Sequence, residues 1–230
     1  MTQTAVILAA GMGTRLGRPW PKPLTPLSDG RTIMRQQIDN LTKAFASELR
    51  VMTVIGFKLE LIIESFPNNL YVYNEAYDQT NTNRSLLKAL KLSGPGGVLW
   101  MNGDVVFDPS VLERIKEYID RDESFVCVNT AAVGDEEVKY RVDTNGLINE
   151  LSKQVVDALG ESVGINFVAD KDKANLISGL EACADDDYFE RGIEITIERD
   201  GTQFLPIDIS DLYAVEVDFE EDLTRANSHL

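Results

Sequence analysis

The stretch Ala5-Val6-Ile7-Leu8-Ala9-Ala10-Gly11-Met12-Gly13-Thr14-Arg15-Leu16-Gly17 joins a short apolar run to a glycine-rich loop. The run 5–8 is continuously apolar, which is typical of a buried parallel strand. Strand and helix patterns then alternate along the chain. We predict strands at 51–55, 70–73 and 98–101, and helices at 34–45, 58–65, 84–92 and 111–119. This alternation predicts an α/β fold with a Rossmann-like, doubly wound and mostly parallel sheet.

The second half of the chain has a different pattern from residue 125 onward. The runs 138–142 and 147–151 flank Asn145-Gly146, which predicts an antiparallel hairpin with a type I′ turn. A further apolar strand is expected at 212–217. Linker-like composition is missing between the halves, so we predict one domain over residues 1–230 with a small antiparallel insertion in its second half.

The composition excludes several classes of function. A net charge of -16 over 230 residues would repel nucleic-acid backbones and anionic membranes, so neither is an expected partner. The single histidine, His229, is the second-last residue, which excludes a Ser/His/Asp triad and a histidine-ligated metal site. Cys127 and Cys183 are isolated, as in a reduced cytoplasmic protein. The apolar run 5–10 is too short for a signal peptide or a membrane span.

Positive charge is concentrated near the glycine-rich loop. Residues 1–50 hold seven basic and three acidic side chains, a local +4, so the remaining 180 residues carry -20. Open α/β sheets bind anionic ligands at the carboxyl ends of their strands. The loop after the first strand is therefore the expected anion site.

The loop fits one of three glycine-loop patterns. The dinucleotide fingerprint requires glycine at position 16, where this chain has Leu16, and an acidic residue at the end of the second strand, where it has Ile55-Gly56. A Walker loop requires a lysine after Gly17, and none is present. What remains is a phosphate-binding turn followed by Arg15 and by Lys22 between two prolines. The alternative is an ordinary strand-to-helix turn with two surface cations.

Any metal must be held by oxygen ligands, because the chain lacks an internal histidine and paired cysteines. This favours a hard cation such as Mg²⁺. Asp104 follows the predicted strand 98–101 and should emerge at the edge of the sheet that carries the glycine-rich loop. The alternative is that Asn102-Gly103 forms a turn that Asp104 only solvates.

Residues 8–24 carry the pattern L-A-A-G-x-G-[TS]-R-[LM] followed by P-K, and so the chain resembles the nucleotidyltransferases that make nucleotide-activated sugars and alcohols. Its short arginine-to-lysine spacing and its length are most similar to the cytidylyltransferases for phosphocholine, inositol 1-phosphate and aminoethylphosphonate. Further similar segments are Val54-Ile55-Gly56-Phe57, Asn74-Glu75-x-Tyr77-x-x-Thr80-Asn81-x-x-x-Ser85-Leu86, Asn102-Gly103-Asp104 and Glu216-Val217-Asp218-x-x-Glu221-Asp222-Leu223.

The resemblance implies that CMP is transferred from CTP to a small phosphorylated alcohol or phosphonate, with Mg²⁺ as cofactor and pyrophosphate as the second product. In this scheme Arg15 and Lys22 bind the phosphates, and Asp104 and Asp218 bind Mg²⁺. The implied nucleotide-binding residues are Leu8, Ala9, Ala10, Gly11, Met12, Gly13, Thr14, Arg15, Asn81, Ser85 and Gly103. The implied acceptor-binding residues are Lys22, Lys153, Glu161, Asn166 and Glu190. Residues 1–120 form the expected nucleotide-binding half and 121–230 the acceptor-binding half.

Several alternatives stay open. Asp218-x-x-Glu221 is also a capping-box pattern, and the segment 81–85 also suits a helix N-cap. The acceptor residues suit a solvated surface, and the aromatics Tyr77, Trp100, Tyr140, Phe167 and Tyr188 suit either a core or a cage for a quaternary ammonium.

The function has two open alternatives as well. One is a sugar-1-phosphate uridylyl- or thymidylyltransferase. The other is a non-catalytic nucleotide-binding regulatory subunit, against which stands the presence of Arg15, Lys22, Asp104 and Asp218 together. A homodimer is an assembly that the sequence leaves open.

Overall fold

The computed structural model describes residues 3–45, 49–131, 133–134 and 137–230. Its strands are β1 Gln3–Ala9, β2 Leu49–Ile55, β3 Leu70–Tyr73, β4 Val98–Asn102, β5 Val105–Phe107, β6 Phe125–Asn129, β7 Lys139–Val142, β8 Ile148–Ser152, β9 Gly160–Val168, β10 Leu205–Asp208 and β11 Ala214–Glu216. Its α-helices are α1 Ile33–Phe45, α2 Leu59–Ser65, α3 Thr82–Leu92, α4 Ser110–Asp120, α5 Asp170–Ala182, α6 Phe189–Asp200 and α7 Glu220–Asn227. The predicted strands and helices of the first 120 residues are confirmed, with ends that differ by a few residues.

The main sheet runs in the order β10-β6-β9-β4-β1-β2-β3. Neighbours β3, β2, β1 and β4 are parallel, and so are β6 and β10. Strand β9 lies between β4 and β6 and is antiparallel to both. The α/β class and the mostly parallel sheet are therefore confirmed, and the antiparallel part includes β9 as well as the predicted hairpin.

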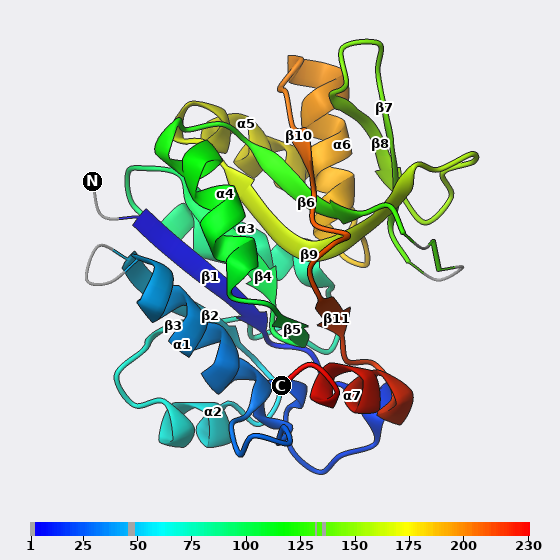
Figure 1. Cartoon of the computed structure of the whole chain (residues 1–230). Coiled ribbons are helices and arrows are strands. Elements are labelled where there is room, and N and C mark those ends of the chain that lie inside the picture. Colours follow the sequence, from blue (N-terminus) through cyan, green and yellow to red (C-terminus); the bar gives the residue numbers. More distant parts are fainter. Residues whose placement is uncertain (1–2, 46–48, 132, 135–136) are drawn as a thin grey trace.

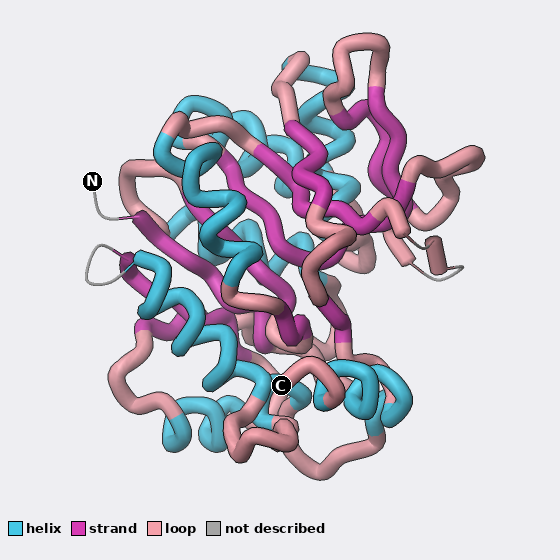
Figure 2. Tube along the Cα trace, in the orientation of Figure 1, coloured by secondary structure: helices cyan, strands magenta, loops and turns pink. Residues whose placement is uncertain are grey.

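Helices cover both faces of this sheet (Figures 1 and 2). Alternation along β1 sends Ala5, Ile7 and Ala9 into the core under α1 and α4, and Val6 and Leu8 into the core under α3, α5 and α6. Side chains of a strand point alternately to opposite faces, so a run that is apolar at every position needs cover on both. This explains why 5–8 reads as a continuous apolar run.

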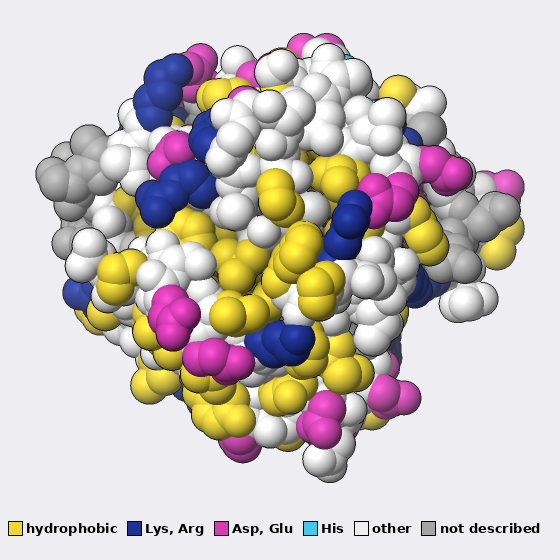
Figure 3. Space-filling model, turned by 90° about the horizontal axis from the view of Figure 1, so that it is seen from below, with side chains coloured by type: hydrophobic (Ala, Val, Ile, Leu, Met, Phe, Trp, Pro, Cys, Tyr) yellow, Lys and Arg dark blue, Asp and Glu magenta, His cyan; other side chains and the backbone are white. Residues whose placement is uncertain are grey.

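A third, smaller core lies where α7 meets the N-terminal loop. Leu16 of the glycine-rich loop packs there with Val217 and Leu223, beside the two-stranded sheet of β5 and β11. The strand predicted at 212–217 is shorter than expected, because only Ala214–Glu216 pairs, antiparallel, with β5. Seen from below, the molecule has many exposed apolar side chains near the centre of this face, with lysine and arginine side chains scattered among and around them (Figure 3).

The predicted hairpin is present as β7 and β8, but its turn type was predicted wrongly. A type I′ turn needs positive φ at both central residues, and only Gly146, at φ 80°, has it. The Gly146 N–H donates to the Asp143 carbonyl at 3.1 Å, and the Asp143 N–H donates to the Leu147 carbonyl at 2.8 Å. The connection is therefore a three-residue loop that ends in a bulge. Asp143 favours it, since its carboxylate accepts from the N–H groups of Asn145 and Leu147.

Helices in the described ranges are all too short or too polar to cross a membrane.

Candidate active site

The carboxyl ends of β1 and β4 meet at one edge of the sheet. The Gly103 N–H after β4 donates to the carbonyl of Leu8 on β1 at 2.9 Å. Gly103 must lack a side chain, because a Cβ there would lie 2.7 Å from that Leu8 oxygen. A cavity of about 660 Å³ opens at this edge and extends toward β9 and the start of α6.

The glycine-rich loop forms one wall of this cavity. Gly13 has φ 60°, in the left-handed region, and the site of its missing Cβ lies 3.1 Å from the Lys22 Cβ. Glycine tolerates both the dihedral angle and the close approach. The N–H groups of Gly11, Met12 and Gly13 donate to no group in the described part of the chain. They are therefore available to an anionic ligand.

Four charged side chains form a cluster at the mouth of the cavity: Arg15, Lys22, Asp104 and Asp218. The Lys22 ammonium is 2.9 Å from Asp104 Oδ2 and also bonds Asp218 Oδ1, and Arg15 lies 2.9 Å from Asp218 Oδ2. Burial by itself lowers the pKa of Lys22, but the two carboxylates outweigh it and raise that pKa above its usual value. Burial by itself raises the pKa of Asp218, but Lys22 and Arg15 outweigh it and hold that pKa below its usual range. Lys22 and Asp218 are therefore both charged near neutral pH.

The Asp218 side chain faces this cluster and does not cap α7. The sequence left open a capping box of Asp218 with Glu221, but the N-cap in the structure is Phe219. The helix begins at Glu220, and Asp222 Oδ2 accepts from the N–H groups of Phe219 at 2.8 Å and Asp218 at 3.1 Å. The side chain of Asp218 therefore has no capping role.

The donor set around Asp104 suits a divalent cation. Its Oδ1 is buried and has no hydrogen-bond partner in the described part, while its Oδ2 and Asp218 Oδ1 both contact Lys22 Nζ. A buried acceptor without a partner is rare and costly. Groups of three or more acidic, cysteine or histidine ligands are not found among the described residues. Two carboxylates suit Mg²⁺, which commonly takes its remaining ligands from phosphates and water.

Another part of the cavity lining is acidic, and we call it the acidic end: Glu137, Glu161 and Glu190 line it together with Lys153. Glu190 Oε2 is buried without a partner in the described part, and burial raises the pKa of Glu190 to about 7. Burial, with the charges of Glu161 and Asp218, also raises the pKa of Glu137. The charge of Lys153 lowers the pKa of both Glu137 and Glu190 without outweighing burial, and its ammonium also lies 4.8 Å from the centre of the Tyr188 ring.

Glu216 also lines the cavity, and the sequence prediction missed it. Its Oε1 accepts from Asn102 Nδ2 at 2.9 Å. Burial and the charge of Asp104 raise the pKa of Glu216 well above its usual value. The signal was available, because residues two apart in an extended segment share a face and Glu216 is two residues before Asp218.

A second, smaller cavity of about 70 Å³ adjoins the first and shares Leu8, Gly11 and Thr82 with it. Asn81 and Ser85 line this smaller cavity. Asn81 is also the N-cap of α3, because its Oδ1 accepts from the Thr82 N–H at 2.8 Å. The N-cap alternative is thus correct for Asn81, and it does not prevent a ligand contact.

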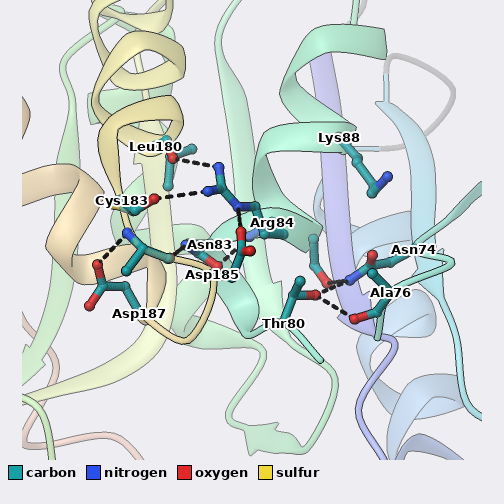
Figure 4. Close-up of polar contacts among 12 residues, drawn as sticks. Asn74, Ala76, Thr80, Asn83, Arg84, Lys88, Leu180, Cys183, Asp185 and Asp187 are labelled. Atoms are coloured by element: carbon teal, nitrogen blue, oxygen red, sulfur yellow. Dashed lines mark hydrogen bonds and ion pairs between the residues drawn. The ribbon is translucent and has the colours of Figure 1, made fainter. Parts of the chain in front are cut away.

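The start of α3 is fastened to the segment between α5 and α6 (Figure 4). Arg84 donates to the Leu180 and Cys183 carbonyls and pairs with Asp185, while Asn83 donates to the Ala184 carbonyl at 2.6 Å. The arginine therefore satisfies carbonyl groups at the end of α5, where a positive charge is favourable. On the other side of the segment, Asn74 Nδ2 donates to Thr80 and Ser85. These bonds hold the wall of the smaller cavity in place.

Most of the predicted site residues face one of the two cavities. Those that line the large one are Leu8, Ala9, Gly11, Gly13, Arg15, Lys22, Gly103, Asp104, Lys153, Glu161, Glu190 and Asp218. Ala10 lines the small one. Met12, Thr14 and Asn166 line neither, and Asn166 is fully buried with both side-chain polar atoms unpartnered in the described part.

The candidate aromatic residues divide in the same way. Trp100, Tyr140 and Phe167 are core residues. Tyr188 lines the large cavity and Tyr77 the small one.

A family model of the MobA-like NTP transferase domain matches residues 5–162, which is more than half of the chain. The chain belongs to the MobA-like NTP transferase family. The matched residues of this NTP transferase include the glycine-rich loop, Lys22 and Asp104, whereas Asp218 lies beyond the match.

Individual relatives extend the comparison. Over 120 residues, 48% of this chain, the protein is 38% identical to the CMP-5'-(3-aminopropyl)phosphonate synthase of Streptomyces rubellomurinus. The matched part is only 18% of that relative's length. The structure of CTP:phosphocholine cytidylyltransferase from Streptococcus pneumoniae has a TM-score of 0.77 at 16% identity, covering 100% of this chain and 99% of that one. A UDP-glucose pyrophosphorylase bound to UDP-glucose has a TM-score of 0.74 at 14% identity, covering 100% and 98%. At these identities the two structures show a shared fold.

Proposed function

We propose that this NTP transferase is a magnesium-dependent cytidylyltransferase, which transfers CMP from CTP to a small phosphorylated alcohol or phosphonate and releases pyrophosphate. The observation that carries this proposal is the charge cluster of Arg15, Lys22, Asp104 and Asp218 at the mouth of the large cavity. It combines cations for phosphates with carboxylates for a metal, beside a loop whose N–H groups are available. In this proposal residues 1–120 supply most of the nucleotide site and 121–230 most of the acceptor site.

The residues suit an in-line displacement at phosphorus. An anionic oxygen of the acceptor forms a bond to the α-phosphorus, while the bond from that phosphorus to the oxygen bridging to the β-phosphate breaks. The electron pair of the broken bond leaves with pyrophosphate. A phosphate or phosphonate is already ionised at neutral pH, so the acceptor needs no general base, in agreement with the lack of an internal histidine. Catalysis then consists of alignment and charge neutralisation.

Each member of the charge cluster has a defined task in this reaction. Lys22, at the centre of the cluster, would hold the α-phosphate and the acceptor anion together, and the more exposed Arg15 would bind the leaving pyrophosphate. Asp104 and Asp218 would hold Mg²⁺. When bound, that ion would neutralise charge on the phosphate oxygens during the displacement. The small cavity, with Asn81 and Ser85, would receive the base and ribose.

The acidic end favours an acceptor with a positive charge opposite its phosphate or phosphonate. Glu190 and Glu137 have raised pKa values there, and a cation would stabilise their ionised forms. Tyr188 is 41% exposed and lines the cavity, and the Lys153 ammonium over its ring shows that a cation can lie there. A phosphocholine or an aminoalkylphosphonate has this chemistry, whereas the head group of inositol 1-phosphate or of a hexose 1-phosphate is uncharged.

Pyrophosphate release tests the proposal directly. The protein is incubated with Mg²⁺, each of CTP, UTP, dTTP, ATP and GTP, and each of phosphocholine, 2-aminoethylphosphonate, inositol 1-phosphate and glucose 1-phosphate. We expect the fastest release with CTP and a cationic acceptor. Faster turnover with UTP and glucose 1-phosphate would replace this proposal with a sugar-1-phosphate uridylyltransferase. Nucleotide binding without release in any combination would support a regulatory subunit.

A further inference from the structure

The turn that carries Asp104 is held by a side chain from α1. Gln37 is fully buried, and its Nε2 donates to the Asn102 carbonyl at 2.8 Å and to the Val105 carbonyl at 2.9 Å. Asn102 is the last residue of β4 and Val105 is the first residue of β5. One amide group therefore bridges both ends of the turn Gly103-Asp104.

Two backbone hydrogen bonds hold the same turn from other elements. The Gly103 N–H donates to Leu8 on β1, and the Val217 N–H donates to the Asp104 carbonyl at 3.0 Å. The backbone around Asp104 is thus held from β1, from α1 and from the end of β11. Of these contacts, only the one from α1 is made by a side chain, so it alone can be removed by substitution.

We propose that Gln37 is a positioning residue for Asp104. By holding both flanking carbonyls, its amide fixes the direction in which the Asp104 carboxylate leaves the turn. The buried Oδ1 of that carboxylate, which has no partner in the described part, is thereby presented to a divalent cation. The inference rests on the proposed function, in which Asp104 is a metal ligand. Removing a group that orients a metal ligand typically weakens metal binding by about 10–100-fold.

The neighbouring residue Gln36 provides a matched control. It is also buried on α1, and its Nε2 donates to the Phe107 carbonyl at 2.6 Å, at the opposite end of β5 from Asp104. Each glutamine has an Oε1 without a hydrogen-bond partner in the described part. Gln36→Met and Gln37→Met each remove one buried amide. Gln36→Met should lower stability less, because it loses one hydrogen bond instead of two and the Phe107 carbonyl still accepts from Asn40 Nδ2. Only the second substitution releases the Asp104 turn.

The test uses the full chain and measures metal binding separately from activity. Mn²⁺ is titrated at a fixed CTP concentration and followed by electron paramagnetic resonance, and the Mg²⁺ concentration for half-maximal rate and the melting temperature are measured in parallel. For Gln37→Met we expect both metal constants to weaken by about tenfold. For Gln36→Met we expect wild-type metal constants with a smaller loss of melting temperature. Combined with Asp104→Asn, Gln37→Met should add little further loss, because both act on one ligand.

Each outcome separates this inference from the proposed function. Wild-type metal constants in Gln37→Met, or equal shifts in Gln36→Met, overturn the positioning role while Asp104→Asn still loses metal. Wild-type metal constants in Asp104→Asn overturn the metal role of Asp104 and the positioning role with it. If Gln37→Met does not fold, Gln37→Asn keeps an amide that is too short to bridge both carbonyls. An unchanged metal response in that variant also overturns the inference.

Discussion

The charge cluster and the acidic end of the large cavity differ in how their charges are stabilised. At the mouth, Lys22 pairs with Asp104 and Asp218, so opposite charges neutralise one another. At the acidic end, Glu190 is buried with one oxygen unpartnered in the described part, and burial raises its pKa to about 7. A buried carboxyl that lacks a cation is costly, whereas a paired one is much less so. The charges of the cluster are therefore neutralised within the chain, whereas Lys153 only partly offsets the burial of Glu190, so that a bound cation would stabilise the acidic end further.

Removing Lys22, the central cation of the charge cluster, should have the largest effect on activity. Lys22→Ala is expected to lower kcat by at least about 100-fold, since it removes the charge that holds the two reacting anions together. Arg18→Ala is the matched control, because Arg18 pairs with Glu220 outside the cavity lining. Steady-state pyrophosphate release measures both. A Lys22→Ala protein that is folded and fully active would show that the mouth is not the reaction centre.

A methyl group on β9 should displace the Glu216 and Asn102 side chains that line the cavity. Gly164 has φ 70°, and a Cβ there would lie 2.5 Å from Glu216 Oε1 and 2.8 Å from Asn102 Nδ2. Gly164→Ala is expected to cost about 3 kcal/mol of unfolding free energy from backbone strain and overlap together. Gly146→Ala has a similar dihedral angle in open space and should cost about 1 kcal/mol. Urea denaturation compares them, and equal losses would rule out the overlap.

Removing the charge at the acidic end should weaken binding of cationic acceptors. Glu190→Gln is expected to raise KM for phosphocholine or 2-aminoethylphosphonate by about tenfold at pH 8, with little change for inositol 1-phosphate. In the unmodified protein the same KM should fall as the pH rises from 6 to 8, because Glu190 ionises through about 7. Lys153 lowers this pKa and Glu194 raises it. A KM that is independent of pH would place the cation elsewhere.

Glu190→Gln weakens acceptor binding but should stabilise the fold at high pH. The pKa of Glu190 is higher in the folded than in the unfolded chain, so its contribution is present at low pH and is lost as the pH rises through about 7. Glu190→Gln should therefore raise the melting temperature at pH 8 and change it little below pH 4.5. Glu198→Gln is the control two turns further along α6, since Glu198 is exposed and is not part of the cavity lining.

The smallest change in activity and stability is expected for substitutions of Asn81, which lines the smaller cavity. Asn81→Ala removes the N-cap of α3 and should cost about 1 kcal/mol of stability, whereas Asn81→Asp keeps the capping oxygen. A ligand role for Asn81 predicts that KM for CTP rises in both variants. A rise confined to Asn81→Ala would mean that the residue serves only the helix.

Much of the mouth could be predicted because its signals are local. The apolar run 5–8, the glycines at 11 and 13, and the cation at 22 lie close together in the chain, where strand geometry and glycine conformations act over a few residues. Asp104 was predictable from its place directly after a strand. Gln37 was not, because glutamine is usually exposed. Its position, three residues after Met34 and four before Leu41, lies on the buried face of α1, and the β4–β5 turn that packs there supplies its hydrogen-bond partners.

The sequence by itself therefore determined the strand-helix alternation, the glycine-rich loop and the excess of positive charge beside it. Only the tertiary structure decided that Asp218, 196 positions after Lys22, pairs with it, and that the N-cap of α7 is Phe219, whose N–H donates to Asp222, so that the capping alternative for Asp218 does not apply. The resemblance had already implied Glu161 and Glu190 as acceptor-binding residues, and the tertiary structure added Glu137 beside them. The physical reason is that local propensities act over a few neighbouring residues. The contacts of Asp218 and of the acidic end depend instead on how β9, β11 and α7 pack against the rest of the fold.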